Sequence, residues 1–284
     1  MKFLILGDLH GSLPEIRLKG FDIILATGDF CPFDKIREYQ FSFIEEKLKN
    51  PKSKANWYDI AGKQKTKSII EKYLKEGRKV LKKLDSIGVP VFIVPGNTDF
   101  TPEEDNWKFL EQDHFKKITK GLKNVLDTHQ KLVDIKEYQI IGYGMSYGPE
   151  KPQYKEDLKR LDKKSLKRKE IEYKMNSIKM SFLFKKSSKP VIFLSHNVPF
   201  KTTIDKITNK RSPRYGYHYG SLITRELIEK YKPLICIGGH IHEHFGKCKI
   251  GKTLCINAGF GPKVNILMEL KGNKIKKLEF YKWK

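Results

Sequence analysis

The chain contains few cysteines and lacks a paired cysteine motif. Only four of its 284 residues are cysteine: Cys31, Cys236, Cys248 and Cys255. None forms a Cys-x-x-Cys pair, which argues against a structural zinc knuckle. Cys248 and Cys255 would face each other if residues 250–253 close a two-residue hairpin. We expect reduced thiols, as in a protein of a reducing compartment.

Long apolar runs are also missing. No stretch approaches the ~20 apolar residues that a membrane-spanning helix needs. The chain passes from Met1 straight into an apolar strand pattern, without the features of a secretory leader. These absences lead us to expect a cytoplasmic protein with no membrane partner.

Acidic residues are scarce relative to basic ones. The chain has 33 Asp and Glu residues against 57 Lys and Arg, so its formal net charge is +24. A surface of this sign can attract nucleic acid. Much of the excess, however, lies in segments such as 155–169, where Lys mixes with Glu and Asp as on solvated helix faces. Nucleic acid is therefore a possible partner but not the favoured one.

The alternation of apolar patterns favours an α/β fold. Short apolar runs typical of buried strands occur at Lys2–Leu6, Ile23–Thr27, Val91–Val94, Val191–Leu194 and Leu234–Ile237. Helical spacing appears in 34–48 and 65–84, and again between 151 and 189. We expect a single domain over residues 1–284 with helical insertions at about 33–88 and 150–189. The first insertion leaves directly from the Asp29 loop, so it could overhang a site there.

Smaller signals predict further elements. Thr101-Pro102-Glu103-Glu104 carries a capping-box pattern and predicts the start of a helix. Ser221 is the expected N-cap of another helix. The segments 131–135 and 138–143 are predicted to be paired strands. The C-terminal part is expected to be β-rich, roughly over 245–249, 253–257, 264–270 and 275–281.

Polar motifs follow the five apolar runs. They are Gly7-Asp8-Leu9-His10-Gly11, Gly28-Asp29, Gly96-Asn97-Thr98-Asp99, Ser195-His196-Asn197 and Gly239-His240-Ile241-His242. In an open α/β sheet, ligands gather outside the carboxyl ends of the strands. Carboxylate, imidazole and amide groups meeting there would suit Mn²⁺, Fe, Zn²⁺ or Ni²⁺.

The order and strand context of these motifs resemble the calcineurin-like metallophosphoesterase superfamily. The resemblance spans residues 7 to 242, and Asn257-Ala258-Gly259 fits the loop that follows the histidine pair. The segment 196–261 is most similar to archaeal and bacterial phosphoesterases related to the Icc cyclic-nucleotide phosphodiesterase. The resemblance implies a four-layer α/β/β/α sandwich of two mixed sheets.

The resemblance also implies two divalent metal ions, of Mn, Fe, Ni or Zn. It places Asp8, His10, Asp29 and His242 on one ion, and Asp29, Asn97, His196 and His240 on the other. Asp29 would bridge the two, because a carboxylate has two oxygens and can span ions ~3.5–4 Å apart. Such a pair activates a water for attack on phosphorus. The implied activity is hydrolysis of a phosphodiester or a phosphomonoester in a small substrate.

One position departs from the family pattern. Thr98 stands where many members have a histidine that protonates the leaving group or stabilises the transition state. Threonine cannot act as a general acid near pH 7, so we expect substrates with good leaving groups. Asp99 is expected to orient a ligand or to cap the loop. Asn97, Asn197 and His218 are candidate substrate contacts.

Two other functions stay open at this point. The first is a nuclease acting on DNA or RNA, which the basic insertions favour and Thr98 disfavours. The second is a non-catalytic metal-binding scaffold, for which Thr98 leaves room but against which the complete ligand set argues. The substrate, the native metals and the oligomeric state do not follow from the sequence.

Overall fold

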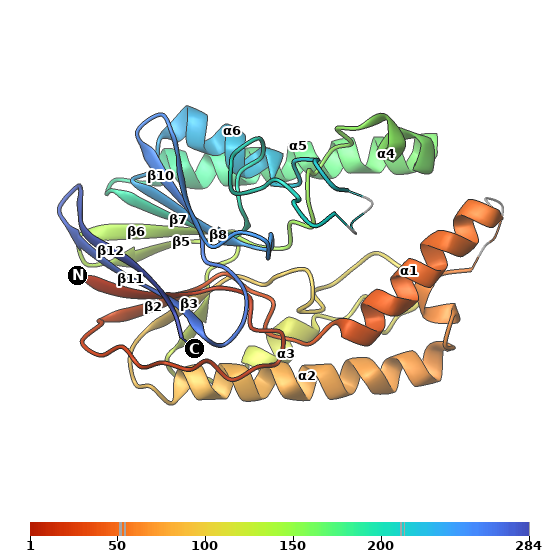
Figure 1. Cartoon of the computed structure of the whole chain (residues 1–284), viewed down its shortest axis with the longest axis horizontal. Coiled ribbons are helices and arrows are strands. Elements are labelled where there is room, and N and C mark those ends of the chain that lie inside the picture. Colours follow the sequence, from red (N-terminus) through yellow and green to blue (C-terminus); the bar gives the residue numbers. More distant parts are fainter. Residues whose placement is uncertain (51–52, 54, 211, 213, 284) are drawn as a thin grey trace.

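The computed structural model describes residues 1–50, 53, 55–210, 212 and 214–283. Two six-stranded sheets face each other, with helices on their outer faces (Figure 1). The first sheet is ordered β12 (Lys274–Lys282), β11 (Val264–Lys271), β1 (Lys2–Leu6), β2 (Ile23–Ala26), β3 (Val91–Ile93) and β4 (Val125–Asp127). The second is ordered β5 (Leu132–Ile135), β6 (Tyr138–Tyr143), β7 (Val191–Asn197), β8 (Ile235–Gly239), β10 (Thr253–Asn257) and β9 (Gly246–Ile250).

The helices complete the outer layers. On the first sheet lie α2 (Lys63–Asp85) and α3 (His114–Thr119), and on the second lie α5 (Lys163–Lys186) and α6 (Leu222–Tyr231). The remaining helices are α1 (Asp34–Lys49), the 3-10 turn η1 (Trp57–Asp59) and α4 (Lys155–Arg160). The four-layer α/β/β/α sandwich expected from the sequence is confirmed.

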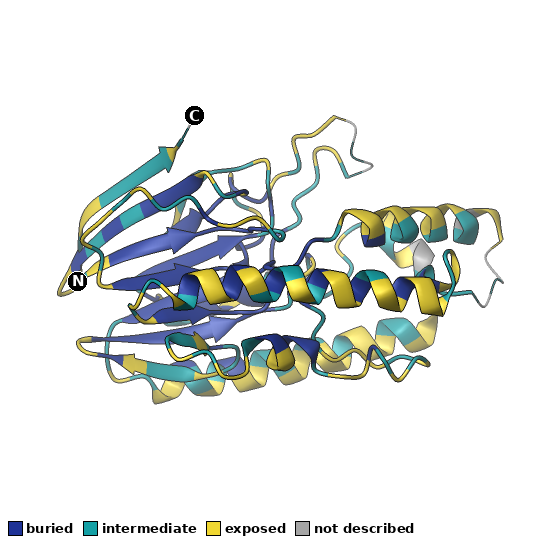
Figure 2. Cartoon of the chain, turned by 90° about the horizontal axis from the view of Figure 1, so that it is seen from below, coloured by how far each residue is buried: buried dark blue, intermediate teal, exposed yellow. Residues whose placement is uncertain are grey.

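Strand β1 shows how the sequence builds these layers. Successive side chains of a strand point to opposite faces of the sheet. Phe3 and Ile5 pack between the two sheets, whereas Leu4 and Leu6 pack against the helical layer around α2. All four side chains are buried, so β1 is apolar from Phe3 to Leu6, after the exposed Lys2 at its start. Figure 2 shows the central strands as the most deeply buried part of the chain, whereas the outermost strands are partly exposed.

The strand directions bring the polar motifs to one end of the sandwich. Strands β1, β2 and β3 are parallel, as are β6, β7 and β8. Their carboxyl ends lie opposite the marked N-terminus in Figure 1. The helical insertions extend beyond the strands on that same side, where α1 and α2 lie below and α4 and α5 above.

The prediction that a helix starts at Thr101 was wrong. Residues 101–105 form no helix, and α3 begins instead at His114, with the Asp113 side chain accepting a hydrogen bond from Lys116 N at 2.8 Å. Tertiary contacts replace the capping box, because Glu103 N donates to the Leu110 carbonyl and the Glu103 carboxylate accepts from the Tyr147 hydroxyl.

Other local predictions agree with the structure. Ser221 caps α6, its side chain accepting from Thr224 N at 3.0 Å. Strands β9 and β10 form the predicted hairpin, with Cys248 opposite Cys255, and all four cysteines are free. Among the described helices, none has both the length and the apolar character needed to cross a bilayer.

Candidate metal centre

Six Asp and His side chains converge at the carboxyl ends of the parallel strands. They form two groups, within each of which the ligand atoms lie within 4.8 Å of one another. The first group is Asp8, His10, Asp29 and His242, and the second is Asp29, His196 and His240. Asp29 belongs to both.

The first group joins the loops after β1, β2 and β8. Asp8 Oδ2 lies 3.1 Å from His242 Nε2, and Asp29 Oδ2 lies 3.4 Å from His10 Nε2. The Nε2 atoms of His10 and His242 are themselves 3.4 Å apart. Two neutral imidazole nitrogens that both point lone pairs inward would repel, so a cation between them suits this geometry.

The second group has the same character. His196 Nε2 lies 3.7 Å from Asp29 Oδ1 and 2.9 Å from Asn97 Oδ1. The other ring nitrogen of His196 lies 2.8 Å from the Thr27 carbonyl. That carbonyl can only accept, so Nδ1 carries the proton and Nε2 is left as a lone pair facing Asn97 and Asp29. These atoms form a donor set that a divalent cation would satisfy.

Two glycines of the motifs lie where the backbone passes too close to a ligand carboxylate to carry a side chain. A Cβ at Gly96 would collide with the Asp29 carboxylate, and one at Gly239 would collide with the Asp8 carboxylate. The ligand loops therefore pack against each other through backbone that carries no side chain.

Three of the ligand residues have left-handed backbone conformations. The φ angles of His10, Asp29 and His240 are +42°, +52° and +68°. Such conformations cost about 1–3 kcal/mol each for a residue with a Cβ, and they cluster at functional sites. Here they turn the chain sharply at the strand ends, so that the side chains point into one small space.

Burial and mutual charge set the protonation of these groups. Burial by itself would raise the pKa of Asp8, but its hydrogen bond with His242 and the neighbouring imidazoles lower it to about 2. Burial lowers the pKa of His10, and lowers that of His240 to about 3. Burial would lower the pKa of His196 as well, but the charges of Asp29 and Asp8 raise it above its usual value. Asp8 is thus ionised, and His10 and His240 are neutral, as metal ligands must be.

The Thr98 side chain points into the protein rather than toward solvent. It is buried, and its backbone N and Oγ1 lie 2.9 and 3.0 Å from Asp29 Oδ1. The same hydroxyl lies 3.0 Å from the Cys31 carbonyl. Thr98 therefore contacts the shared carboxylate directly.

Asp99 ties two ligand loops together. Its carboxylate accepts from the backbone N atoms of Phe30 at 2.8 Å, Cys31 at 3.1 Å and Gly96 at 2.8 Å. Burial, followed by the charge of Asp29, raises the pKa of Asp99 to about 7, although these N–H groups favour the ionised form. The side chain thus joins the loop after β2 to the loop after β3.

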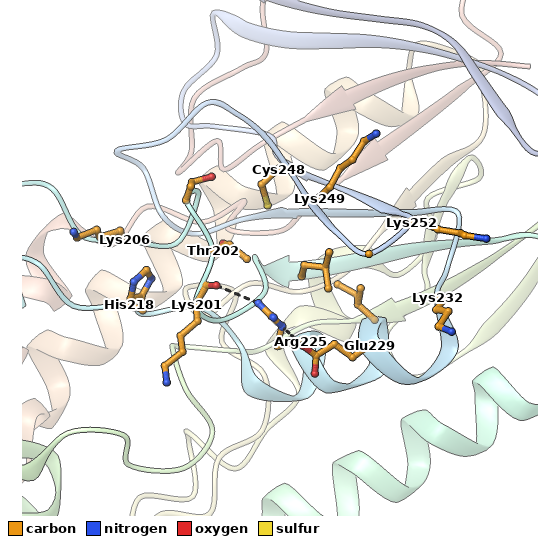
Figure 3. Close-up of a pocket in the computed structure, with 14 residues that line it drawn as sticks. Lys201, Thr202, Lys206, His218, Arg225, Glu229, Lys232, Cys248, Lys249 and Lys252 are labelled. Carbon is orange, nitrogen blue, oxygen red and sulfur yellow. Dashed lines mark hydrogen bonds and ion pairs between the residues drawn. The ribbon is translucent and has the colours of Figure 1, made fainter.

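The other two candidate substrate contacts, Asn197 and His218, are engaged by neighbouring groups. Asn197 is fully buried, and its Nδ2 donates to the Tyr219 carbonyl at 3.0 Å. His218 belongs to neither ligand group. Its Nδ1 lies 2.7 Å from Asp205 Oδ1, and the ring lines a separate hollow (Figure 3).

Several residues around the ligands were not predicted from the sequence. Thr27 holds His196 through its carbonyl, and its hydroxyl donates to Asp8 Oδ1 at 3.2 Å. The ring of Phe260 stacks on His242 with centroids 4.4 Å apart. Position is the only signal that could have indicated them: Thr27 directly precedes Gly28-Asp29, and Phe260 follows Asn257-Ala258-Gly259.

The first helical insertion reaches the neighbourhood of Asn97. A small cavity there is lined by Asn97 together with Phe33, Ile36, Trp57 and Phe100. Phe33 and Ile36 lie at the start of α1, and Trp57 lies in η1. This is the placement expected for an insertion that leaves from the Asp29 loop.

Comparisons with known proteins agree with this geometry. A family model described as calcineurin-like phosphoesterase matches residues 1–244. An uncharacterized protein of Methanocaldococcus jannaschii is 23% identical over 284 residues, covering 97% of this chain and 94% of that protein.

Solved structures share the fold at low identity. One superposes with a TM-score of 0.64 at 19% identity, covering 99% of this chain and 98% of its own. A Thermus thermophilus protein gives 0.54 at 14%, covering 99% and 98%. A phosphopantetheinyl hydrolase from Mycobacterium tuberculosis gives 0.53 at 12%, covering 92% and 90%. With the family model matching most of its length, this chain belongs to the calcineurin-like phosphoesterase family.

Proposed function

We propose that the protein hydrolyses a phosphoester, more specifically a phosphodiester, with two divalent cations that share Asp29. One observation carries the proposal: the Asp29 carboxylate lies between two ligand groups, with Oδ2 toward His10 and Oδ1 toward His196. A carboxylate placed in this way suits a pair of ions ~3.5–4 Å apart.

The residues around Asp29 fit such a pair. When bound, the two cations would act as Lewis acids and lower the pKa of a water used for in-line attack on phosphorus. Asp8, Asp29 and four imidazoles supply the donors, and Asn97 adds a neutral oxygen. Because few of the donors are charged, the site retains positive charge for an anionic substrate. Thr27 fixes the ring of His196 so that Nε2 faces the site.

Thr98 bears on the choice of substrate. Its hydroxyl is engaged by Asp29 and by the Cys31 carbonyl, so it positions the shared carboxylate rather than donating a proton to the substrate. We infer that esters with acidic leaving groups are the better substrates. The structural neighbour named as a phosphopantetheinyl hydrolase supports hydrolysis as an activity of this fold.

A substrate and metal screen tests the proposal. Bis-p-nitrophenyl phosphate, p-nitrophenyl phosphate and cyclic nucleotides are each assayed with Mn²⁺, Ni²⁺, Zn²⁺ and Mg²⁺. We expect metal-dependent hydrolysis, fastest with bis-p-nitrophenyl phosphate. If no metal supports turnover of any of these esters, the proposal fails.

The net charge of +24 favours one alternative, a nuclease acting on DNA or RNA. Metal-dependent cleavage of labelled single- or double-stranded DNA would identify it, provided that Asp29→Asn abolishes the cleavage. A non-catalytic scaffold would bind the metals and hydrolyse none of these substrates.

A further inference from the structure

A hollow of about 970 Å³ lies on the outer side of the second sheet, separate from the candidate metal ligands. We name it the basic hollow. Three parts of the chain line it: the loop Lys201–Lys206 with His218, α6 from Arg225 onward with its C-cap Lys232, and the β9–β10 hairpin from Cys248 to Lys252 (Figure 3). Its volume falls in the range of small-molecule sites, about 300–1,000 Å³.

The basic hollow is enriched in cations even for this chain. Of its 14 lining residues, six are Lys or Arg, whereas the whole chain has 57 in 284. The six are Lys201, Lys206, Arg225, Lys232, Lys249 and Lys252. The acidic residue of the lining, Glu229, is paired with Arg225 at 2.6 Å. Among the ion pairs of the described residues, none involves these five lysines.

The walls of the hollow are held in place by a buried carboxylate. Asp205 is fully buried and accepts from Lys201 N at 2.9 Å, Thr202 N at 2.7 Å and Gly220 N at 3.1 Å, as well as contacting His218 Nδ1. Arg225 Nη1 joins α6 to the same loop through the Lys201 carbonyl, at 3.1 Å (Figure 3). The hollow is therefore formed before any ligand arrives, which reduces the entropy cost of binding.

The Lys and Arg residues of the lining surround an uncharged surface, which we call the floor of the hollow. Ile228 is buried, and Cys248 and Ile250 are half-buried. Figure 3 shows Lys232 and Lys252 at one end of the hollow and Lys201 and Lys206 at the other, with their long side chains extending outward along its rim. A ligand that satisfies both ends carries more than one anionic group, with an uncharged body between or beside them.

Protection of a sheet edge explains only part of this pattern. Strand β9 is an edge strand, and lysines on an edge discourage pairing between sheets. That reason covers Lys249 in β9. It does not cover Lys201 in the opposite loop or Lys232 just after α6, which line the same hollow from other elements.

We propose that the basic hollow binds a ligand bearing two or more phosphate groups and an uncharged body. Lysine ammonium groups bind phosphate as point charges, and the apolar floor offers a surface for a base. A nucleoside polyphosphate and a nucleic-acid strand share this chemistry. The site is distinct from the metal centre, since none of the candidate metal ligands lines it.

The test compares two charge-reversed variants of the full chain in the presence of metal. Lys232→Glu with Lys252→Glu alters the hollow. The matched control, Lys274→Glu with Lys276→Glu, alters exposed residues of β12 and lowers the net charge by the same amount. The probes are a non-hydrolysable β,γ-imido analogue of ATP, inorganic imidotriphosphate and a fluorescein-labelled oligothymidine with a phosphorothioate backbone, with binding followed by calorimetry or fluorescence anisotropy.

We expect the hollow variant to weaken binding about tenfold or more, and the control to change it less than about twofold. Tighter binding of the nucleotide than of imidotriphosphate would indicate that the base contacts the uncharged floor of the hollow. Stronger binding of the oligonucleotide than of the nucleotide would identify nucleic acid as the source of the phosphates. Equal losses in both variants, or no loss in the hollow variant, would overturn the proposal. Hydrolysis of bis-p-nitrophenyl phosphate should be unchanged in both variants, so failure of this proposal and failure of the hydrolase proposal are separate results.

Discussion

The two ligand groups that share Asp29 differ in their access to solvent. In the first group, the side chains of His10 and His242 are 13% and 27% exposed. In the second, His240 is half-buried, but the His196 side chain is 0% exposed, and its ring is fixed by the Thr27 carbonyl. The comparison teaches that one carboxylate joins a group with two partly exposed histidines, the open group, to a group with one fully enclosed histidine, His196, the closed group. An ion in the open group should exchange readily, whereas one in the closed group should be held.

Removing the shared ligand should have the largest effect. Asp29→Asn keeps the shape of the side chain but removes its charge, so the two groups lose their common anion. Even partners outside the metal ligands typically contribute about 10–100-fold, so we expect activity to fall by at least about 10²-fold, with loss of at least one bound ion. Steady-state kinetics and elemental analysis measure both. Wild-type turnover in this variant would overturn the assignment of Asp29.

Removing one histidine from each group should separate the two sites. His242→Ala damages the open group, so the ion that remains should be the one in the closed group, which a weak chelator removes slowly. His196→Ala damages the closed group, so the ion that remains should be removed quickly. Each variant should lose at least about tenfold in affinity at the altered site. The rate of metal loss after chelator addition is the measurement, with thermal unfolding as a control for folding. Identical release from the two variants would show that the groups do not differ.

The Thr98 hydroxyl should have an intermediate effect. Thr98→Val removes its hydrogen bond to Asp29 while keeping the shape, and we expect about a 10–100-fold loss in metal affinity or activity. Thr98→Ser, which keeps the hydroxyl, is the matched control. If both variants behave as wild type in a metal titration, Thr98 does not position Asp29.

Lowering the pH should produce a smaller difference between the metal affinities of the two groups. Metal binding needs neutral histidines, and the pKa of His196 is raised by Asp29 and Asp8, although burial opposes this. Its proton therefore competes with the ion even above pH 6.5, the usual pKa of histidine. Burial lowers the pKa of His10, so that ring competes only at lower pH. As pH falls, His196 should therefore be protonated before His10, and an ion held by His196 should lose affinity first, by about tenfold per pH unit. Metal titrations from neutral to mildly acidic pH would check this, and an earlier loss from the open group would contradict it.

The sequence predicted which side chains converge better than it predicted what surrounds them. Asp8, Asp29 and His242 follow apolar strands in motifs whose glycines permit close approach, so residue order and strand context suffice to bring them together. The anchor of His196 is the carbonyl of Thr27, and a backbone atom has no residue-type signature. The buried orientation of Thr98 likewise depends on the packing of two loops, which a linear pattern does not specify.

Local sequence patterns predicted the structure wrongly where contacts with residues outside the pattern determined it. The capping-box pattern at Thr101 predicted a helix, but Glu103 bonds to Leu110 and Tyr147 instead. By contrast, the Ser221 cap formed as predicted, its side chain accepting from Thr224 N within the first turn of α6. The basic hollow was not foreseen, since its cations come from three elements between 201 and 252 that share no motif.

The number of ions per chain tests the central claim most directly. Wild-type protein is loaded with Mn²⁺ or Zn²⁺, freed of excess metal by gel filtration, and analysed for metal and protein together. Two ions per chain in the wild type, and at most one in Asp29→Asn, is the result expected from a carboxylate shared by two sites. A single ion in the wild type, or an unchanged pair in the variant, would contradict the account.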